Sequence, residues 1–181
     1  NLYSFDLEQW GVDRYPGESL MEYYHRIGDS PLAKSKNLCT WDLSLEGSAE
    51  FNENYTIDPD VYYFSFSTYA THSENKNGNH RPDSKMSFHL WSTSLLMGYD
   101  DNAPDSAWYE NDGVCNTISM THPFGSPVKT FDGFCQKGIW QVCEKLHIDH
   151  EAVIGHHVSK SKFKKIIVIY NEHAELLYSL K

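Results

Sequence analysis

The sequence is poor in basic residues, and this shortage excludes one broad class of partner. It has 15 Lys and Arg against 25 Asp and Glu, which gives a net charge of -10. Nucleic-acid binding needs Lys and Arg to neutralise phosphates, so we expect no nucleic-acid partner. No apolar run reaches the ~18 residues of a membrane-spanning helix, so we expect no transmembrane segment.

The cysteines are also few, and none is closely spaced with another. The four lie at Cys39, Cys115, Cys135 and Cys143, with no Cys-x-x-Cys pair, which argues against a zinc knuckle. Their even number favours a secreted, extracellular protein with one or two disulfides, although buried free thiols would give the same pattern. A disulfide from Cys115 to Cys135 or Cys143 is predicted if the strands near them are neighbours, with Cys39 left free or bonded to another chain.

Two further features agree with an extracellular location. Asn54-Tyr55-Thr56 is a glycosylation sequon. The first residue is Asn1 and no signal-like region follows it, so we expect a mature or cleaved chain.

What the sequence does contain indicates one globular α/β domain over residues 1–181. Aromatic residues make up 14% of the chain, which excludes disorder. Helices are predicted at 18–27, 41–54 and 162–181, and buried strands at 61–68 and 139–143. Residues 69–107 are long, polar and irregular, which is typical of an inserted binding or lid segment. The alternation of helices with buried strands favours a sheet with helices on its faces.

Each of the three candidate functional residues has a structural alternative. Asp112 lies in the tight turn Asn111-Asp112-Gly113 and is either a turn former or a positioned carboxylate. His150 follows the strand at 139–143 and is either a general base or a histidine on a solvated loop. Asp42 is by default a helix cap.

The order of these residues is informative, because an Asp after one strand and a His after a later strand form the second part of the Ser-Asp-His hydrolase triad. The nucleophile is missing. The sequence contains no Gly-x-Ser-x-Gly and no His-Gly-Gly type oxyanion loop.

Several segments carry a resemblance to a known family, in order from about Asp6 to the end. They are W-G-V-D-R-Y-P-G-E-S, W-D-L-S-L-E-G-S-A-E-F-N, D-P-D-V-Y-Y-F-S-F-S-T, W-Y-E-N-D-G-V-C-N-T-I-S-M, Q-K-G-I-W-Q-V and I-D-H-E-A-V-I-G. Together they resemble the C-terminal half of the secreted thermoalkalophilic and staphylococcal-type lipases. The resemblance implies an α/β-hydrolase fold of which this sequence supplies the later strands, the insertion and the C-terminal helix.

The resemblance assigns roles to the three candidates. Asp112 matches the family's triad aspartate and His150 its triad histidine, while Asp42 matches a carboxylate ligand of a structural zinc, so zinc is an expected cofactor. The family's calcium site uses side chains two and seven residues after the histidine, which here are Ala152 and His157. Neither suits calcium, so we expect that site to be lost. The four cysteines are not part of the family pattern.

The expected function is therefore hydrolysis of carboxylic esters, of the triacylglycerol lipase type. This chain would supply Asp112 and His150 to a second chain that carries the Gly-x-Ser-x-Gly nucleophile and the oxyanion hole, forming a heterodimer. The alternative is a non-catalytic binding, toxin or carrier subunit derived from a lipase, in which the two residues are idle.

Overall fold

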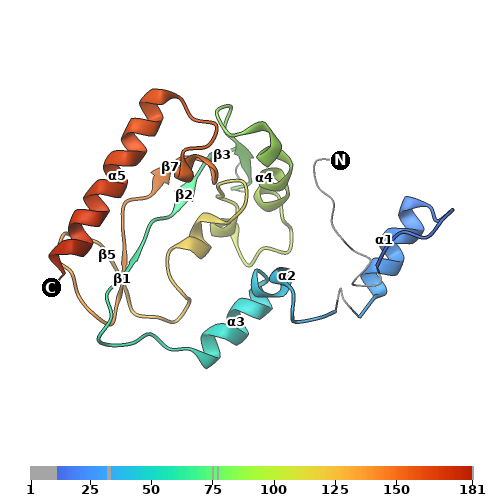
Figure 1. The fold of residues 1–181 in the computed structure, drawn as a ribbon, viewed down its shortest axis with the longest axis horizontal. Coiled ribbons are helices and arrows are strands. Elements are labelled where there is room, and N and C mark those ends of the chain that lie inside the picture. Colours follow the sequence, from blue (N-terminus) through green and yellow to red (C-terminus); the bar gives the residue numbers. More distant parts are fainter. Residues whose placement is uncertain (1–11, 32–33, 75, 77, 181) are drawn as a thin grey trace. The chain divides into compact units, whose positions relative to one another are not determined.

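The parallel strands that position the candidate site run through the middle of the second of two compact units (Figure 1). The computed structural model describes residues 12–31, 34–74, 76 and 78–180. The first unit ends at Thr56 and the second runs from Ile57 onward. The candidates Asp112 and His150 belong to the second unit, and Asp42 belongs to the first.

The first unit is helical. Its helices are α1 (Leu20–Asp29), α2 (Cys39–Asp42) and α3 (Leu45–Asn54). Ser19 and Glu22 form a capping box at the start of α1, and Arg26 pairs with Glu18. The helical spacing of Leu20, Tyr23, Tyr24 and Ile27 predicts a core-facing helix, but none of the residues of α1 is buried, so that prediction is wrong. The helix is fixed at its start by the capping box and the ion pair, and it exposes the apolar Leu20, Met21 and Tyr24.

Asp42 does not cap a helix. It is the last residue of α2, and the cap of α3 is Ser44, whose hydroxyl accepts a hydrogen bond from the Gly47 N–H. The predicted single helix over 41–54 is therefore two helices with a break before Leu45. The prediction of Asp42 as a cap is wrong, because Ser44 is the residue with extended backbone immediately before the first turn of α3.

The second unit is built on parallel strands. Its central sheet has the order β1-β6-β5, with β1 (Tyr63–Ser65), β5 (Val128–Thr130) and β6 (Trp140–Val142). The pair β2 (Thr68–Tyr69) and β7 (Leu146–His147), also parallel, continues from the ends of β1 and β6. The strand predicted at 139–143 is thus present as β6, and its central Gln141 is completely buried.

The single long strand predicted over 61–68 is instead β1 and β2 with a break between them. Ser65 lies opposite Val142, whereas Thr68 lies opposite Leu146, so the later segment has one extra residue. This extra residue is a β-bulge, which bends the ladder where the chain approaches the site. Hydrogen bonds from Cys143 N to Ser65 O and from Leu146 N to Ser67 O, both 2.9 Å, carry the pairing across the break.

Residues 69–107, predicted as an insertion, have secondary structure of their own. They form the antiparallel pair β3 (Thr71–Ser73) and β4 (His80–Pro82), the 3-10 turn η2 (Phe88–Leu90) and α4 (Trp91–Gly98). Further 3-10 turns follow at η3 (Ser106–Trp108), η4 (Thr117–Met120) and η5 (Ala152–Ile154). Helix α4 packs against β4 and lies on one side of the parallel strands (Figure 1). Buried Ala70, Met86 and Leu90 form a small apolar cluster in this region.

The C-terminal helix α5 (Lys160–Ser179) runs along the other side of the parallel strands (Figure 1). The predicted helix is present, but the single apolar packing face that helical spacing predicts for it, from Phe163 and Ile166 to Leu177 and Leu180, is only partly buried. Ile166 is its buried residue, and His173 contacts the rings of Phe64 and Phe66. Phe163, Ile167, Tyr170 and Leu177 belong to the predicted face yet remain exposed. The strands therefore cover only part of the predicted apolar face.

Candidate active site

Asp112 is held by a tight turn between η3 and η4. Asn111 and Asn116 close this turn as an isolated β-bridge, and the buried Asn111 side chain donates to the backbone oxygens of Ser94 and Tyr109. Gly113 has φ +99°, which L side chains rarely adopt, and a Cβ there would lie 2.7 Å from the Leu90 Cβ. Turn chemistry and close packing therefore fix the backbone that presents Asp112.

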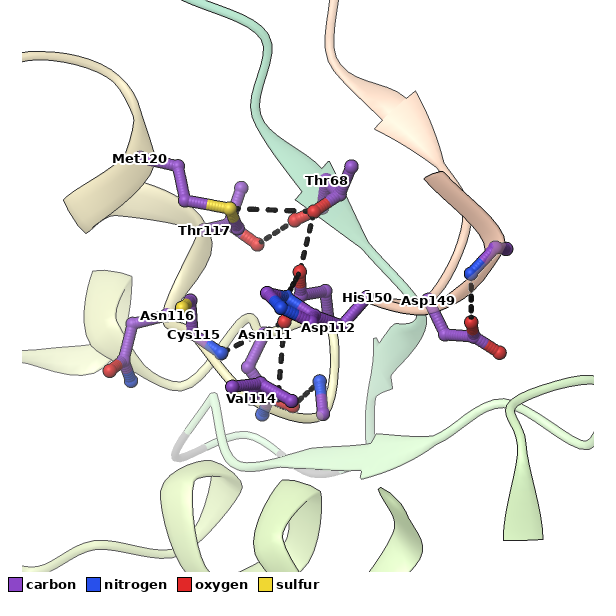
Figure 2. A network of polar contacts seen from close by, with 12 residues as sticks. Thr68, Asn111, Asp112, Val114, Cys115, Asn116, Thr117, Met120, Asp149 and His150 are labelled. Atoms are coloured by element: carbon purple, nitrogen blue, oxygen red, sulfur yellow. Dashed lines mark hydrogen bonds and ion pairs between the residues drawn. The ribbon is translucent and has the colours of Figure 1, made fainter. Parts of the chain in front are cut away.

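The carboxylate of Asp112 is buried and fully hydrogen-bonded (Figure 2). Its Oδ1 accepts from the backbone N–H groups of Val114 at 3.0 Å and Cys115 at 2.8 Å. Its Oδ2 accepts from the hydroxyl of Thr68 at 2.7 Å and lies 3.0 Å from Nδ1 of His150. A buried carboxylate is costly unless its oxygens are hydrogen-bonded in this way.

His150 sits on the loop just after β7, a short parallel strand that follows the predicted strand β6. Asp149 fixes this loop, because its carboxylate accepts from Ser87 N at 2.9 Å and from Ala152 N at 2.9 Å. The backbone N–H of His150 also donates to the Asp112 carbonyl at 3.0 Å. The two residues are thus linked through both main chain and side chain.

The ring of His150 combines a fixed tautomer with access to solvent. A carboxylate only accepts, so Nδ1 carries the proton in the bond to Asp112, and Nε2 has the free lone pair. The His150 side chain is 46% exposed, against 1% for Asp112. An oriented, half-exposed imidazole on a buried carboxylate is the arrangement that acts as a general base.

Sequence reasoning did not identify Thr68. This residue ends the aromatic run at 61–68, and its hydroxyl bonds Asp112 while its carbonyl accepts from the hydroxyl of Thr117 at 2.8 Å. Strand β2 therefore fixes the carboxylate from a third segment of chain. The only signal in the sequence was a hydroxyl residue at the end of a buried strand, which is too common to single out.

A second carboxylate–histidine group lies outside this site. The carboxylate of Asp83 lies 2.7 Å from Nδ1 of His72 and 2.5 Å from Nε2 of His147. Burial alone would raise the pKa of Asp83, but the hydrogen bonds from His147 and His72 outweigh it and lower that pKa. Spacing in the sequence gave no hint of this group, because 64 residues separate Asp83 from His147.

The cysteines are all free thiols, so the predicted pairing of Cys115 with Cys135 or Cys143 is not confirmed. Burial, followed by the nearby Asp112 charge, raises the pKa of Cys115. Burial likewise raises the pKa of Cys143, with a smaller contribution from Cys135. These two thiols are therefore protonated at neutral pH.

The expected zinc and calcium positions are incomplete on their own. Within the described part of the chain, no group of three metal-ligating side chains includes Asp42. At the calcium position, Ala152 is buried with only a methyl side chain, and His157 lies 3.5 Å from the carboxylate of Glu151, which also pairs with His89. Imidazoles around one carboxylate do not fit a hard cation that prefers oxygen ligands.

One group of potential metal ligands does occur among the described residues. Asp112, Cys115 and His150 each offer a ligand atom, and these atoms all lie within 4.8 Å of one another.

No helix in the described ranges is long and apolar enough to cross a membrane.

The geometry places a carboxylate–histidine pair beyond the carboxyl ends of parallel strands, which is the arrangement of the α/β hydrolases, and comparison with known proteins agrees. The family model of the lipase-like C-terminal domain matches residues 2–177. The chain therefore belongs to that family, and the resemblance seen in the sequence is confirmed.

Individual relatives show how much of a lipase the chain represents. Lipase 1 of Staphylococcus aureus is 35% identical over 152 residues, which is 83% of this chain but 22% of that protein. The lipase of Staphylococcus epidermidis is 32% identical over 159 residues.

Solved structures give the same result. The Staphylococcus hyicus lipase matches with a TM-score of 0.68 and 29% identity, covering 96% of this chain and 46% of that one. Lipase 1 from Pelosinus fermentans matches with a TM-score of 0.64 and 30% identity, over 99% of this chain and 49% of that one. The chain thus spans about a fifth of the curated relatives and under half of the solved structures, as expected for the C-terminal part of a lipase.

Proposed function

We propose that this chain supplies the aspartate and histidine of a Ser-His-Asp triad for the hydrolysis of carboxylic esters of the acylglycerol type. The observation that carries the proposal is the bond of His150 Nδ1 to the buried, fully satisfied Asp112 carboxylate. Relatives named as lipases support the ester substrate. We further propose that the protein is secreted.

In this mechanism His150 removes the proton from a serine hydroxyl through Nε2 as the serine attacks the ester carbonyl. Asp112 holds the imidazole in the tautomer with Nδ1 protonated and stabilises the imidazolium that forms. His150 then gives the proton to the leaving alcohol. Because Asp112 already accepts bonds from Thr68 and two backbone amides, its position does not change during this cycle.

The serine and the oxyanion donors lie outside this sequence, so we propose a Ser-bearing polypeptide that completes the domain. Two surfaces in the second unit support it. Among the described residues β1 pairs with β6 alone, which leaves its other edge open, and α5 exposes the apolar Ile167, Tyr170 and Leu177. A domain core divided in two would bury roughly 2,000 Å² or more at such an interface.

Native gel filtration followed by intact mass analysis tests this second proposal. We expect a species larger than the 20.9 kDa of this sequence, containing a Gly-x-Ser-x-Gly segment either in a longer chain or in a companion chain. A folded, monodisperse species of 20.9 kDa without any other polypeptide would contradict it. A non-catalytic binding, toxin or carrier subunit would then be the better account.

Asp42 remains a proposed zinc ligand, and histidines from that other polypeptide would complete the zinc site.

The catalytic proposal is tested with two histidine variants of the full-length protein, together with any chain that copurifies. His150→Ala should lower esterase turnover by ~10⁴-fold or more, because it removes the base. His147→Ala is the matched control, since His147 also bonds an aspartate and lies close by in the sequence but outside the site. An active protein whose two variants behave alike would contradict the proposal.

A further inference from the structure

Cys115 sits directly beside the Asp112–His150 pair, and the proposed hydrolysis does not use it. Its backbone N–H donates to Asp112 Oδ1 at 2.8 Å, so the same turn that fixes the carboxylate fixes the thiol (Figure 2). One ligand atom each from Asp112, Cys115 and His150 lies within 4.8 Å of the other two. Thiolate, imidazole and carboxylate are the three ligand types that zinc takes in proteins.

The Asp112–His150 spacing is close to that of a tetrahedral metal site, and the Cys115 sulfur, within 4.8 Å of the other two ligand atoms, is the ligand that would have to move inward. Zinc–ligand bonds of ~2.0–2.3 Å at tetrahedral angles separate two ligand atoms by roughly 3.3–3.6 Å. His150 Nδ1 and Asp112 Oδ2 are 3.0 Å apart, so they would need to open by only a few tenths of an ångström. The half-exposed imidazole is free to make that adjustment, and solvent reaches it.

We propose that Asp112, Cys115 and His150 form a binding site for a thiophilic divalent cation such as Zn²⁺, and that the bound cation switches off the base. The second half of this proposal rests on the proposed catalytic function, and the first half does not. The cation takes the place of the proton between His150 Nδ1 and Asp112 Oδ2. A water molecule occupies the fourth position, as is usual where the protein provides three ligands.

The protons balance in this step. Cys115 gives up its thiol proton to solvent when it becomes a thiolate ligand. The imidazole stays neutral, because the proton that leaves Nδ1 is carried on Nε2. One proton is therefore released for each cation bound. With Nε2 protonated, His150 has no lone pair to accept the proton of a nucleophile, so hydrolysis stops while the cation is bound.

Sulfur distinguishes this site from the other histidine groups. His72 and His147 around Asp83, and His89 and His157 around Glu151, offer only nitrogen and oxygen. A cation held there would give no thiolate signature. Co²⁺ substituted for Zn²⁺ absorbs in the near ultraviolet when a thiolate is its ligand, so a cobalt band that depends on Cys115 reports this site.

The first experiment adds Co²⁺ to the full-length protein, with any chain that copurifies, under reducing conditions. We expect a thiolate–cobalt charge-transfer band that Zn²⁺ abolishes by displacement. Cys115→Ser and Cys115→Ala should lose the band, whereas Cys39→Ser, a substitution of an exposed thiol in the other unit, should keep it. Absence of the band in the unmodified protein, or its persistence in both Cys115 variants, would overturn the site.

The second experiment measures ester hydrolysis at buffered free Zn²⁺, with each variant compared with its own metal-free rate. Because loss of even an outer-shell partner weakens metal binding 10–100-fold, Cys115→Ser should raise the inhibitory Zn²⁺ concentration by at least ~10-fold. Cys39→Ser should not change it. A Cys115-dependent cobalt band without inhibition would overturn the switch. A protein without any metal-free esterase activity would instead refute the catalytic function, and cobalt binding would still decide the site.

Discussion

Asp112 and Asp83 are both aspartates bonded to histidine, yet their surroundings differ in kind. Asp112 is buried, has one histidine partner and is otherwise held by Thr68 and two backbone amides. Asp83 has two histidine partners, His72 and His147, whose side chains are 57% and 61% exposed. A carboxylate–histidine bond alone therefore does not distinguish the proposed catalytic pair from the Asp83 group. What singles out Asp112 is that the rest of its carboxylate is already fixed.

The largest difference in turnover should come from replacing each of the two aspartates, Asp112 and Asp83, with asparagine. In Asp112→Asn the amide oxygen can still accept from Val114 and Cys115, so the fold should survive. The amide nitrogen, however, is a donor and forces His150 into the wrong tautomer, which should lower turnover by ~10⁴-fold. Asp83→Asn should leave turnover nearly unchanged. Steady-state kinetics of ester hydrolysis should be measured for both variants. A near-normal turnover of Asp112→Asn would refute the proposed catalytic role of Asp112.

A smaller effect should follow from Thr68→Val, which removes one donor from Asp112 Oδ2 without changing the side-chain shape much. Leaving a buried carboxylate short of a hydrogen bond should cost about 1–3 kcal/mol of stability. Thr68→Ser retains the hydroxyl and should recover most of that loss. Chemical denaturation of both variants measures the difference, and equal stabilities would show that the hydroxyl does not matter.

The effect at Asp83 should depend on pH. Its pKa is lowered in the folded protein, so its ionised form contributes stability at pH values above its ordinary pKa of 3.8. That contribution is lost as the pH falls through the lower, folded-state pKa. Asp83→Asn should therefore reduce stability by at most about 1 kcal/mol at pH 5 and by less at lower pH. A difference that grew on acidification would contradict the assigned direction.

The smallest effect should come from added calcium. We expect it to change the stability of neither the Asp112 group nor the Asp83 group. Ala152 offers no side-chain oxygen and His157 offers an imidazole, so calcium should not shift the melting temperature. A bound ion at a hundred times its dissociation constant would add ~2.7 kcal/mol, which a melt would detect. A calcium-dependent rise that chelation abolishes would show that other oxygens complete the site.

The sequence identified Asp112 and His150 as candidates, because the turn that carries Asp112 and the loop that carries His150 lie in segments that resemble a known family. It also predicted the Asn111-Asp112-Gly113 turn, since tight turns depend on local residue types. It did not lead to Thr68 or to the Asp83 group, because those contacts join segments far apart in the chain. The packing face of α5 was predicted too wide for a similar reason, since helical periodicity does not say how much of an apolar face the strands cover.

The backbone bond from His150 N–H to the Asp112 carbonyl has a consequence for the chain between them. The two residues are 38 positions apart, and this bond closes the excursion through η4, β5 and β6 at its base. The free-energy cost of closing a loop grows only with the logarithm of its length, by about 0.6 kcal/mol for each doubling. Lengthening the connection between η4 and β5 near Gly125 should therefore cost little stability. That connection is the natural place for tags, labels or inserted modules.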